Sequence, residues 1–125
     1  MKKKAIINTR ILDPRNNIDE IGGILINDIG KIEAIGKKVT KENVSNAEIY
    51  DCKNKVSIPG IIDMRVFVGE PGFEYKENFR TLSQAAVSGG VTGVATMPNT
   101  LPLIDNVSTL DFVKRRSRDK SIIKI

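Results

Sequence analysis

The residues that could do chemistry lie within one stretch of the chain, from Ile58 to Asn106. Three of them, Asp63, Arg65 and Phe67, alternate with apolar residues along a run of the kind that forms a strand. Because strand side chains alternate between two faces, these three share one face and the apolar side chains share the other. A strand buried on both sides, with mixed chemistry on one side, is typical of the mouth of an α/β barrel, where strand ends carry the site.

Five short motifs follow one another in this stretch. They are Pro59-Gly60, Ile62-Asp63, Glu70-Pro71-Gly72-Phe73-Glu74, Gly89-Gly90-Val91-Thr92 and Met97-Pro98-Asn99-Thr100. In this order they resemble the first strand–helix–strand unit of dihydroorotase and its relatives in the amidohydrolase superfamily. The resemblance implies a divalent metal centre, usually zinc, that activates water to attack the cyclic amide of dihydroorotate. The reverse reaction closes the ring of N-carbamoyl-L-aspartate in pyrimidine biosynthesis.

The resemblance breaks down at the positions that matter most for catalysis. The two metal-binding histidines of the family fall on Arg65 and Phe67, and the arginine that holds the substrate carboxylate falls on Gly69. The chain contains no histidine. A guanidinium stays protonated and a phenyl ring has no donor atom, so neither side chain can replace an imidazole nitrogen. The family's other metal ligands come from later strands, beyond Ile125. We therefore predict degenerate metal-site positions at Arg65 and Phe67, no catalytic residue, and no metal or other cofactor held by this chain.

Arg65 leaves three interpretations open. In the first, the charge of Arg65 replaces that of the metal and pairs with Asp63 or with an acidic group from a later strand. In the second, Arg65 is tolerated because the metal site has decayed. In the third, Arg65 acts in catalysis directly. Phe67 is predicted to fill the vacated cavity, where burial of its apolar area contributes about 1.5–3 kcal/mol. Asp63 matches a family aspartate, and an ordinary structural pair with the neighbouring guanidinium explains it equally well.

Asn99 is the candidate substrate-binding residue, because the resemblance aligns it with a substrate-contacting asparagine of the family. The alternative is a turn residue after a strand, with Pro98 fixing the backbone. Without the family's arginine, Asn99 alone is not expected to hold a substrate dianion. We interpret Glu70-Pro71-Gly72 as loop geometry, and Glu74 and Glu77 as charges at the start of a helix rather than an acid–base pair.

Five short strands are predicted before the motifs, at 4–12, 21–27, 31–35, 47–51 and 56–58. The second and third form a hairpin across Asp28-Ile29-Gly30, and the turn Asp13–Asn17 contains two asparagines that suit positive φ. We expect a small antiparallel β unit that ends at Pro59-Gly60. By the resemblance it is the N-terminal portion of a β-sandwich beside the barrel.

The elements predicted after Gly60 are strand Ile61–Val68, helix Glu74–Ser88, strand Val91–Met97, helix Thr109–Ser117 and the start of a third strand at Ser121–Ile125. The first helix ends at Gly89-Gly90 and turns four residues toward the sheet: Phe79, Leu82, Ala85 and Ala86. The second begins with a capping-box-like pair, Ser108 and Asp111. Its basic end, Lys114-Arg115-Arg116, suits the negative pole of the helix dipole.

Composition excludes several classes of protein. Hydrophobic residues make up 40% and charged residues 28%, as in ordinary globular proteins. The net charge of +5 is spread along a chain that lacks aromatic platforms, so no nucleic-acid binding is expected. The single cysteine, Cys52, leaves no internal disulfide or paired-cysteine metal site and fits a reducing cytoplasm. No run approaches the roughly 20 apolar residues of a membrane span.

With 125 residues, the chain is too short for an eight-stranded barrel, which takes about 250. The predicted fold class is α/β: an N-terminal β-sandwich portion at 1–58, then the first strands and helices of an incomplete TIM-like (β/α)8 barrel at 59–125. The predicted function is a dihydroorotase-family protein without its metal-dependent activity. The resemblance suggests that it works in an oligomer as a structural partner of aspartate carbamoyltransferase. The alternatives are an active cyclic amidohydrolase with a reduced metal site and a truncated, non-functional fragment.

Overall fold

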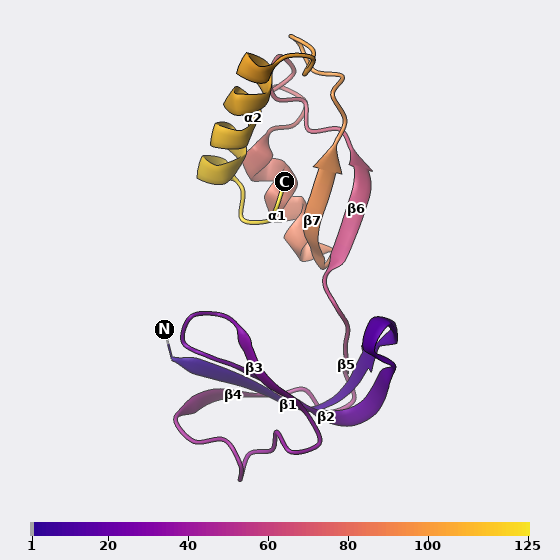
Figure 1. The fold of residues 1–125 in the computed structure, drawn as a ribbon, viewed down its shortest axis with the longest axis vertical. Helices are drawn as coiled ribbons and strands as arrows, with labels where there is room; N and C mark the ends of the chain where they lie inside the picture. Colours follow the sequence, from indigo (N-terminus) through magenta and orange to yellow (C-terminus); the bar gives the residue numbers. More distant parts are fainter. Residues whose placement is uncertain (1) are drawn as a thin grey trace. The chain divides into compact units, whose positions relative to one another are not determined.

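A computed structural model describes residues 2–125. The chain divides into two compact units, Met1–Pro59 (unit 1) and Gly60–Ile125 (unit 2). Figure 1 shows strands alone, with one short 3-10 turn, in unit 1 and strands with helices in unit 2. The fold is therefore mixed α/β, and each unit is described by itself below.

Unit 1 is one mixed sheet with strand order β3-β2-β1-β4, in which β5 also pairs with β1. Its strands are β1 (Lys3–Asp13), β2 (Ile18–Ile26), β3 (Ile32–Gly36), β4 (Ala47–Asp51) and β5 (Val56–Ser57). The hairpin of β2 and β3 is antiparallel as predicted, whereas β4 and β5 run parallel to β1. The expectation of a purely antiparallel unit was therefore wrong, because the connection after β3 crosses to the other edge of the sheet instead of turning tightly.

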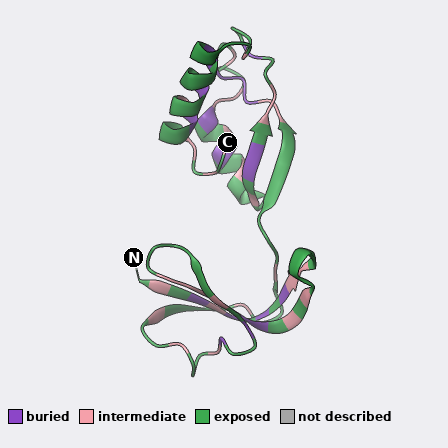
Figure 2. Cartoon of the chain, viewed as in Figure 1, coloured by how far each residue is buried: buried purple, intermediate pink, exposed green. Residues whose placement is uncertain are grey.

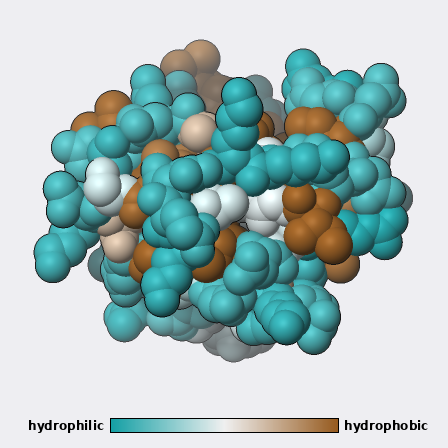
Figure 3. Space-filling model, turned by 90° about the horizontal axis from the view of Figure 1, so that it is seen from below, coloured by the Kyte–Doolittle hydropathy of each residue, from teal (hydrophilic) through white to brown (hydrophobic). Residues whose placement is uncertain are grey.

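The core of unit 1 follows the alternation of β1, which buries Ala5, Ile7, Thr9 and Ile11. The hydroxyl of Thr9 is satisfied inside the unit, since it lies 2.9 Å from the Ser57 hydroxyl oxygen and donates to the Lys55 carbonyl at 3.0 Å. Other large apolar side chains stay exposed. On the face of the molecule in Figure 3, apolar side chains form separate patches between hydrophilic ones.

The predicted turn after β1 is a short 3-10 helix, η1 (Pro14–Asn16). The Asp13 carboxylate accepts hydrogen bonds from the backbone N–H groups of Arg15 and Asn16, which caps this turn. Of the two asparagines expected to suit positive φ, only Asn17 adopts it, with φ 53°.

Unit 2 is a parallel strand pair with two helices. Its elements are β6 (Ile61–Val66), α1 (Phe79–Ser88), β7 (Val91–Thr96) and α2 (Val107–Lys120). β6 and β7 run parallel, and α1 packs against both β7 and α2. In Figure 1, β7 lies between β6 and the helices. Val68, Phe79 and Val113 form the buried cluster of this unit.

Both helices begin at residues other than those predicted. Helix α1 starts at Phe79 rather than Glu74, because the Asn78 side chain accepts from the N–H groups of Arg80 and Thr81 and completes a capping box. Its buried face includes Ser83 in place of the expected Ala85.

Helix α2 starts two residues before the predicted boundary. Asn106, rather than Ser108, is its N-cap and accepts a hydrogen bond from the N–H of Thr109 at 2.9 Å. The helix also runs on past Ser117, to Lys120. Neither helix in the described part of the chain is long and apolar enough to cross a membrane.

One edge of the strand pair agrees with expectation, and the exposure of β6 does not. The segment expected to begin a third strand makes one isolated parallel bridge, Lys124 to Gly93, beside β7. β6 was expected to be buried on both faces, yet Ile62 is 63% exposed and Met64 75% exposed. In Figure 2 the length of β6 is exposed while the middle of β7 is buried. That expectation fails because α1 packs mainly over β7 and α2 rather than over β6, and because β7 is the only strand paired with β6 within residues 2–125.

Candidate functional site

The candidate site lies where β6 and β7 end, because the carboxyl ends of parallel strands meet at one edge of their sheet. Arg65 is exposed near this end of β6, and Asp63 is exposed two residues earlier in the strand. The Asp63 carboxylate accepts a hydrogen bond from the backbone N–H of Arg65 at 3.0 Å. No ion pair joins the two side chains, nor does any other carboxylate in residues 2–125 pair with Arg65. The expected Asp63–Arg65 salt bridge is therefore not formed, and a partner from a later strand stays a prediction.

Phe67 follows the end of β6 and belongs to an aromatic cluster. Its ring centroid lies 6.0 Å from that of Phe73, and the Phe73 and Tyr75 centroids lie 6.5 Å apart. The Lys76 ammonium sits 5.4 Å from the Phe73 centroid, within the range of cation–π attraction. The half-buried Phe67 ring thus packs on the loop that leads to α1. Its assignment as the filler of a former metal cavity stays a prediction.

Asn99 lies in the loop after β7, and its side chain is exposed. The hydrogen bonds of this loop use backbone groups around it: Thr100 N–H donates to the Pro98 carbonyl at 2.9 Å, as does Ile104 N–H at 3.1 Å. The Thr100 hydroxyl donates to the Pro102 carbonyl at 2.7 Å. This geometry suits a turn residue, and a contact of Asn99 with substrate stays a prediction.

Glu70 has a larger structural role than the sequence indicated. Its side chain is only 2% exposed, and each carboxylate oxygen has a different partner. Oε2 accepts from the backbone N–H of Phe79 at 3.1 Å, and Oε1 accepts from Arg116 Nε at 2.7 Å. One carboxylate thus ties the loop after β6 to the start of α1 and to α2. The signal in the sequence was the position of Arg116, on the same stripe of α2 as the buried Val113 and Ser117.

The other acidic side chains of the loop serve local structure. Glu74 accepts from the Gly72 N–H at 3.0 Å, and Glu77 accepts from the Asn78 N–H and the Thr81 hydroxyl. These contacts agree with charges at a loop and helix start. Within residues 2–125, no three Cys, Asp or Glu side chains come together as a metal site would require. The residues at the β6 end therefore do not fit zinc, since neither Arg65 nor Phe67 offers it a lone pair.

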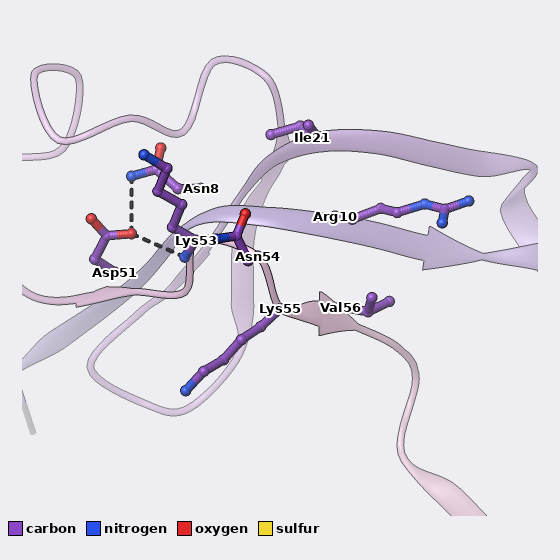
Figure 4. Close-up of a pocket in the computed structure, with 8 residues that line it drawn as sticks. All are labelled: Asn8, Arg10, Ile21, Asp51, Lys53, Asn54, Lys55 and Val56. Atoms are coloured by element: carbon purple, nitrogen blue, oxygen red, sulfur yellow. Dashed lines mark hydrogen bonds between the residues drawn. The ribbon is translucent and has the colours of Figure 1, made fainter.

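Unit 1 has a surface hollow of about 570 Å³, shown in Figure 4. It is lined by Asn8, Arg10, Ile21, Asp51, Lys53, Asn54, Lys55 and Val56. Asp51 accepts from Asn8 Nδ2 at 3.0 Å and from the Lys53 N–H at 3.1 Å. The Asn8 hydrogen bond is the main reason why the pKa of Asp51 lies below its usual value. Arg10 forms an ion pair with Asp19. Because Asp51 and Arg10 already have partners, they do not converge on a ligand.

Comparisons with known proteins agree on one family. The family model described as "Dihydro-orotase-like" matches residues 54–125. A dihydroorotase of Chlorobaculum tepidum is 43% identical over 114 residues, covering 89% of this chain and 26% of that protein. A dihydroorotase of Ehrlichia canis is 37% identical over 123 residues, covering 97% of this chain and 27% of that protein. The chain thus spans about a quarter of the length of these relatives.

Solved structures show the same fold. The L-hydantoinase (dihydropyrimidinase) of Arthrobacter aurescens aligns with a TM-score of 0.85 at 22% identity, covering 98% of this chain and 26% of that one. A D-hydantoinase aligns with a TM-score of 0.73 at 25% identity, covering 97% of this chain and 25% of that one. Both alignments cover nearly all of the chain, so the sheet of unit 1 and the strand–helix arrangement of unit 2 are common to these structures.

Proposed function

The chain belongs to the dihydroorotase-like family, and from this premise we propose that it is part of a dihydroorotase-like protein of pyrimidine biosynthesis that no longer catalyses the family reaction. The observation that carries the proposal is the pair Arg65 and Phe67 at the end of β6. Neither side chain can donate a lone pair to a metal ion. A zinc-dependent attack on a cyclic amide would lack the activated water that such chemistry requires.

We also propose that unit 2 is the start of a TIM-like barrel and unit 1 a portion of a β-sandwich. The parallel order of β6 and β7, with α1 as the crossover, supports this assignment. The parallel bridge of Lys124 to β7 supports a third strand beside β7. An eight-stranded barrel takes about 250 residues, so further strands would have to complete it.

A chimera tests the loss of catalysis. Residues 1–125 of this chain would replace the matching region of the Chlorobaculum tepidum dihydroorotase, so that the later strands come from that relative. Cyclisation of N-carbamoyl-L-aspartate is measured with added zinc and after chelation, with the unmodified relative as the reference. We expect no turnover above the chelated control. Zinc-dependent turnover by the chimera would contradict the proposal and support an active enzyme with a reduced metal site.

We further propose a structural role, as an oligomeric partner of an aspartate carbamoyltransferase in the cytoplasm. The family membership supports this role. The complete protein would be mixed with the aspartate carbamoyltransferase of its own source and analysed by sedimentation velocity. A stable joint species is expected, and separate sedimentation at micromolar concentrations would contradict the partnership.

A further inference from the structure

The loop after β7 and the first turns of α2 expose several large apolar side chains in one short stretch. Within residues 101–112 these are Leu101, Leu103, Val107, Leu110 and Phe112. The opposite face of α2 is buried in unit 2 through Thr109, Val113 and Ser117, and Figure 2 shows the rest of the helix exposed. Apolar side chains scattered singly over a surface are ordinary, whereas a group of them marks a surface that another molecule covers.

A hollow of about 280 Å³ lies within this stretch. It is lined by Pro71, Pro102, Ser108, Thr109 and Phe112. Two prolines and a phenylalanine make it mainly apolar, with hydroxyl groups at one side. Pockets for small molecules usually have volumes of about 300–1,000 Å³. This hollow is therefore better suited to one projecting apolar side chain than to a whole small-molecule ligand.

Contacts between the two loops at its rim hold the hollow in shape. The Leu101 N–H donates to the Pro71 carbonyl at 3.0 Å, and the Thr100 hydroxyl donates to the Pro102 carbonyl at 2.7 Å. Gly72 packs directly against Leu101, where an added Cβ would clash with backbone atoms. Both loops are thus held before anything binds, which lowers the conformational entropy lost on binding.

The exposed side of α2 becomes basic beyond Phe112. Five of the seven residues at 114–120 are Lys or Arg. Arg116 pairs with Glu70, and Arg118 lies 3.7 Å from Asp119. Three others, Lys114, Arg115 and Lys120, have no carboxylate within ion-pair distance among residues 2–125. The helix dipole favours cations within the last turn only, so it does not account for residues 114 and 115.

We propose that the hollow and the basic half of α2 together dock an acidic segment of a partner protein. One apolar side chain of that segment fills the hollow against Phe112. Its carboxylates lie over Arg115, one turn along the helix from Phe112, and over the adjacent Lys114. Cations without a partner beside an apolar anchor favour a segment of opposite charge. A concave site needs a projecting side chain, which a lipid surface does not offer, and the proposal does not depend on whether the protein is catalytic.

A random peptide library tests the chemistry of the partner without assuming its sequence. Short peptides displayed on phage are selected on the immobilised 125-residue chain, after removal of those that bind the support alone. We expect the enriched peptides to carry surplus Asp and Glu around a Leu, Phe or Trp. Enrichment of neutral or basic peptides, or of none, would overturn the proposal.

The affinity of the most enriched peptide, measured by fluorescence anisotropy, locates its binding surface. Lys114→Glu/Arg115→Glu and Phe112→Ser should each weaken binding at least about tenfold, as expected for residues that dominate an interface. Matched controls are Arg80→Glu and Val87→Ser, because both side chains are exposed on α1 and neither lines the hollow. The controls should change the affinity less than about twofold. Equal losses in test and control variants would refute this surface.

A hollow-filling variant keeps the test decisive if Phe112→Ser fails to fold. Ser108→Trp fills the hollow from an exposed position and removes no buried side chain. It should abolish peptide binding, and retained binding by folded Ser108→Trp would overturn the role of the hollow. Co-sedimentation with vesicles of phosphatidylserine and phosphatidylcholine tests the lipid alternative. Vesicle binding that Phe112→Ser removes would replace the partner protein by a membrane and so overturn the proposal.

Discussion

Arg65 and Arg116 are two arginines of unit 2 in opposite environments. Arg65 is exposed and has no carboxylate partner within residues 2–125. Arg116 pairs at 2.7 Å with Glu70, whose side chain is 2% exposed. An exposed charge costs little to keep or to lose, whereas a buried carboxylate left without its partner costs several kcal/mol. The sequence motifs singled out Arg65, but Arg116 has the larger structural role.

Replacing Arg65 by Met in this 125-residue chain should change the free energy of unfolding by less than about 0.5 kcal/mol, the usual range for surface substitutions. Urea unfolding measures the difference. In a completed barrel, a carboxylate from a later strand would raise the cost to about 3–5 kcal/mol if the guanidinium stands in for a metal charge. If Arg65→Met already lowers the unfolding free energy of the 125-residue chain strongly, Arg65 has a partner in solution that the structure does not show.

Replacing Arg116 by Met should destabilise the chain by about 2–4 kcal/mol, because it leaves the Glu70 carboxylate buried with only one hydrogen bond. The value falls below that of a fully buried pair since the Arg116 side chain is 42% exposed. Arg115→Met is the matched control on the same helix, where the guanidinium donates only to the Asp111 carbonyl at 3.4 Å. Equal, small effects of the two substitutions would contradict the role assigned to Glu70.

The pKa of Asp51 provides a test in unit 1. It is lowered mainly by the Asn8 side chain and further by the Lys53 N–H. A lowered folded pKa stabilises the fold above the unfolded value of about 3.9, and this contribution is lost as the pH falls through the folded pKa. Asn8→Gly keeps the φ of 59° accessible and should raise the Asp51 pKa, as followed by carboxyl NMR. Asn17→Gly, also at positive φ, should leave Asp51 unchanged.

At the scale of elements, the starts of the helices were the least predictable feature. The sequence offers Asn106 and Ser108 as caps for α2, and both are good capping residues. The structure uses Asn106, whose carboxamide oxygen accepts from the Thr109 N–H and hydroxyl at 2.9 and 3.2 Å. With this cap, Thr109 and Val113 face the core. Asn106 and Ser108 are equally good caps by local chemistry, so the burial of these two side chains selects Asn106.

Asn106→Ala should therefore cost about 1 kcal/mol of unfolding free energy, the typical value of an N-cap side chain. Ser108→Ala lies within the first turn of α2 and should cost less than about 0.5 kcal/mol. Thermal or urea unfolding of the two variants decides between the caps. If Ser108→Ala costs more than Asn106→Ala, Ser108 is the N-cap of α2, as the sequence predicted.

For the candidate site, the chemistry of single residues could be predicted, while their contacts could not. The absence of histidine follows from the sequence alone, and so does the inability of Arg65 and Phe67 to bind a metal. The Phe67–Phe73 contact and the turn that the Phe73 N–H closes on the Gly69 carbonyl depend on backbone conformation. The motif Glu70-Pro71-Gly72 gave no sign of which groups its carboxylate would meet, because Phe79 and Arg116 lie far along the chain.

At the scale of the whole molecule, periodicity predicted the strand–helix–strand order of unit 2 and the strands of unit 1 within a few residues. It could not predict the direction of β4 and β5, because pairing partners depend on how the connection after β3 crosses the sheet. Nor could it predict the exposure of β6. A parallel strand is normally covered on both faces, and β6 has a neighbour on one edge only in the described residues.

This exposure leads to a last prediction. An apolar strand with a free edge is a site for association with another chain. Met64 is 75% exposed, so Met64→Lys should reduce self-association in sedimentation velocity while changing the unfolding free energy by less than about 0.5 kcal/mol. Val68, which is fully buried in the same segment, is the control: Val68→Lys should unfold unit 2, because it places an unpaired ammonium in the core. If Met64→Lys destabilises the chain as severely as Val68→Lys, β6 is already covered in solution. If it leaves association unchanged, the chains meet through another surface.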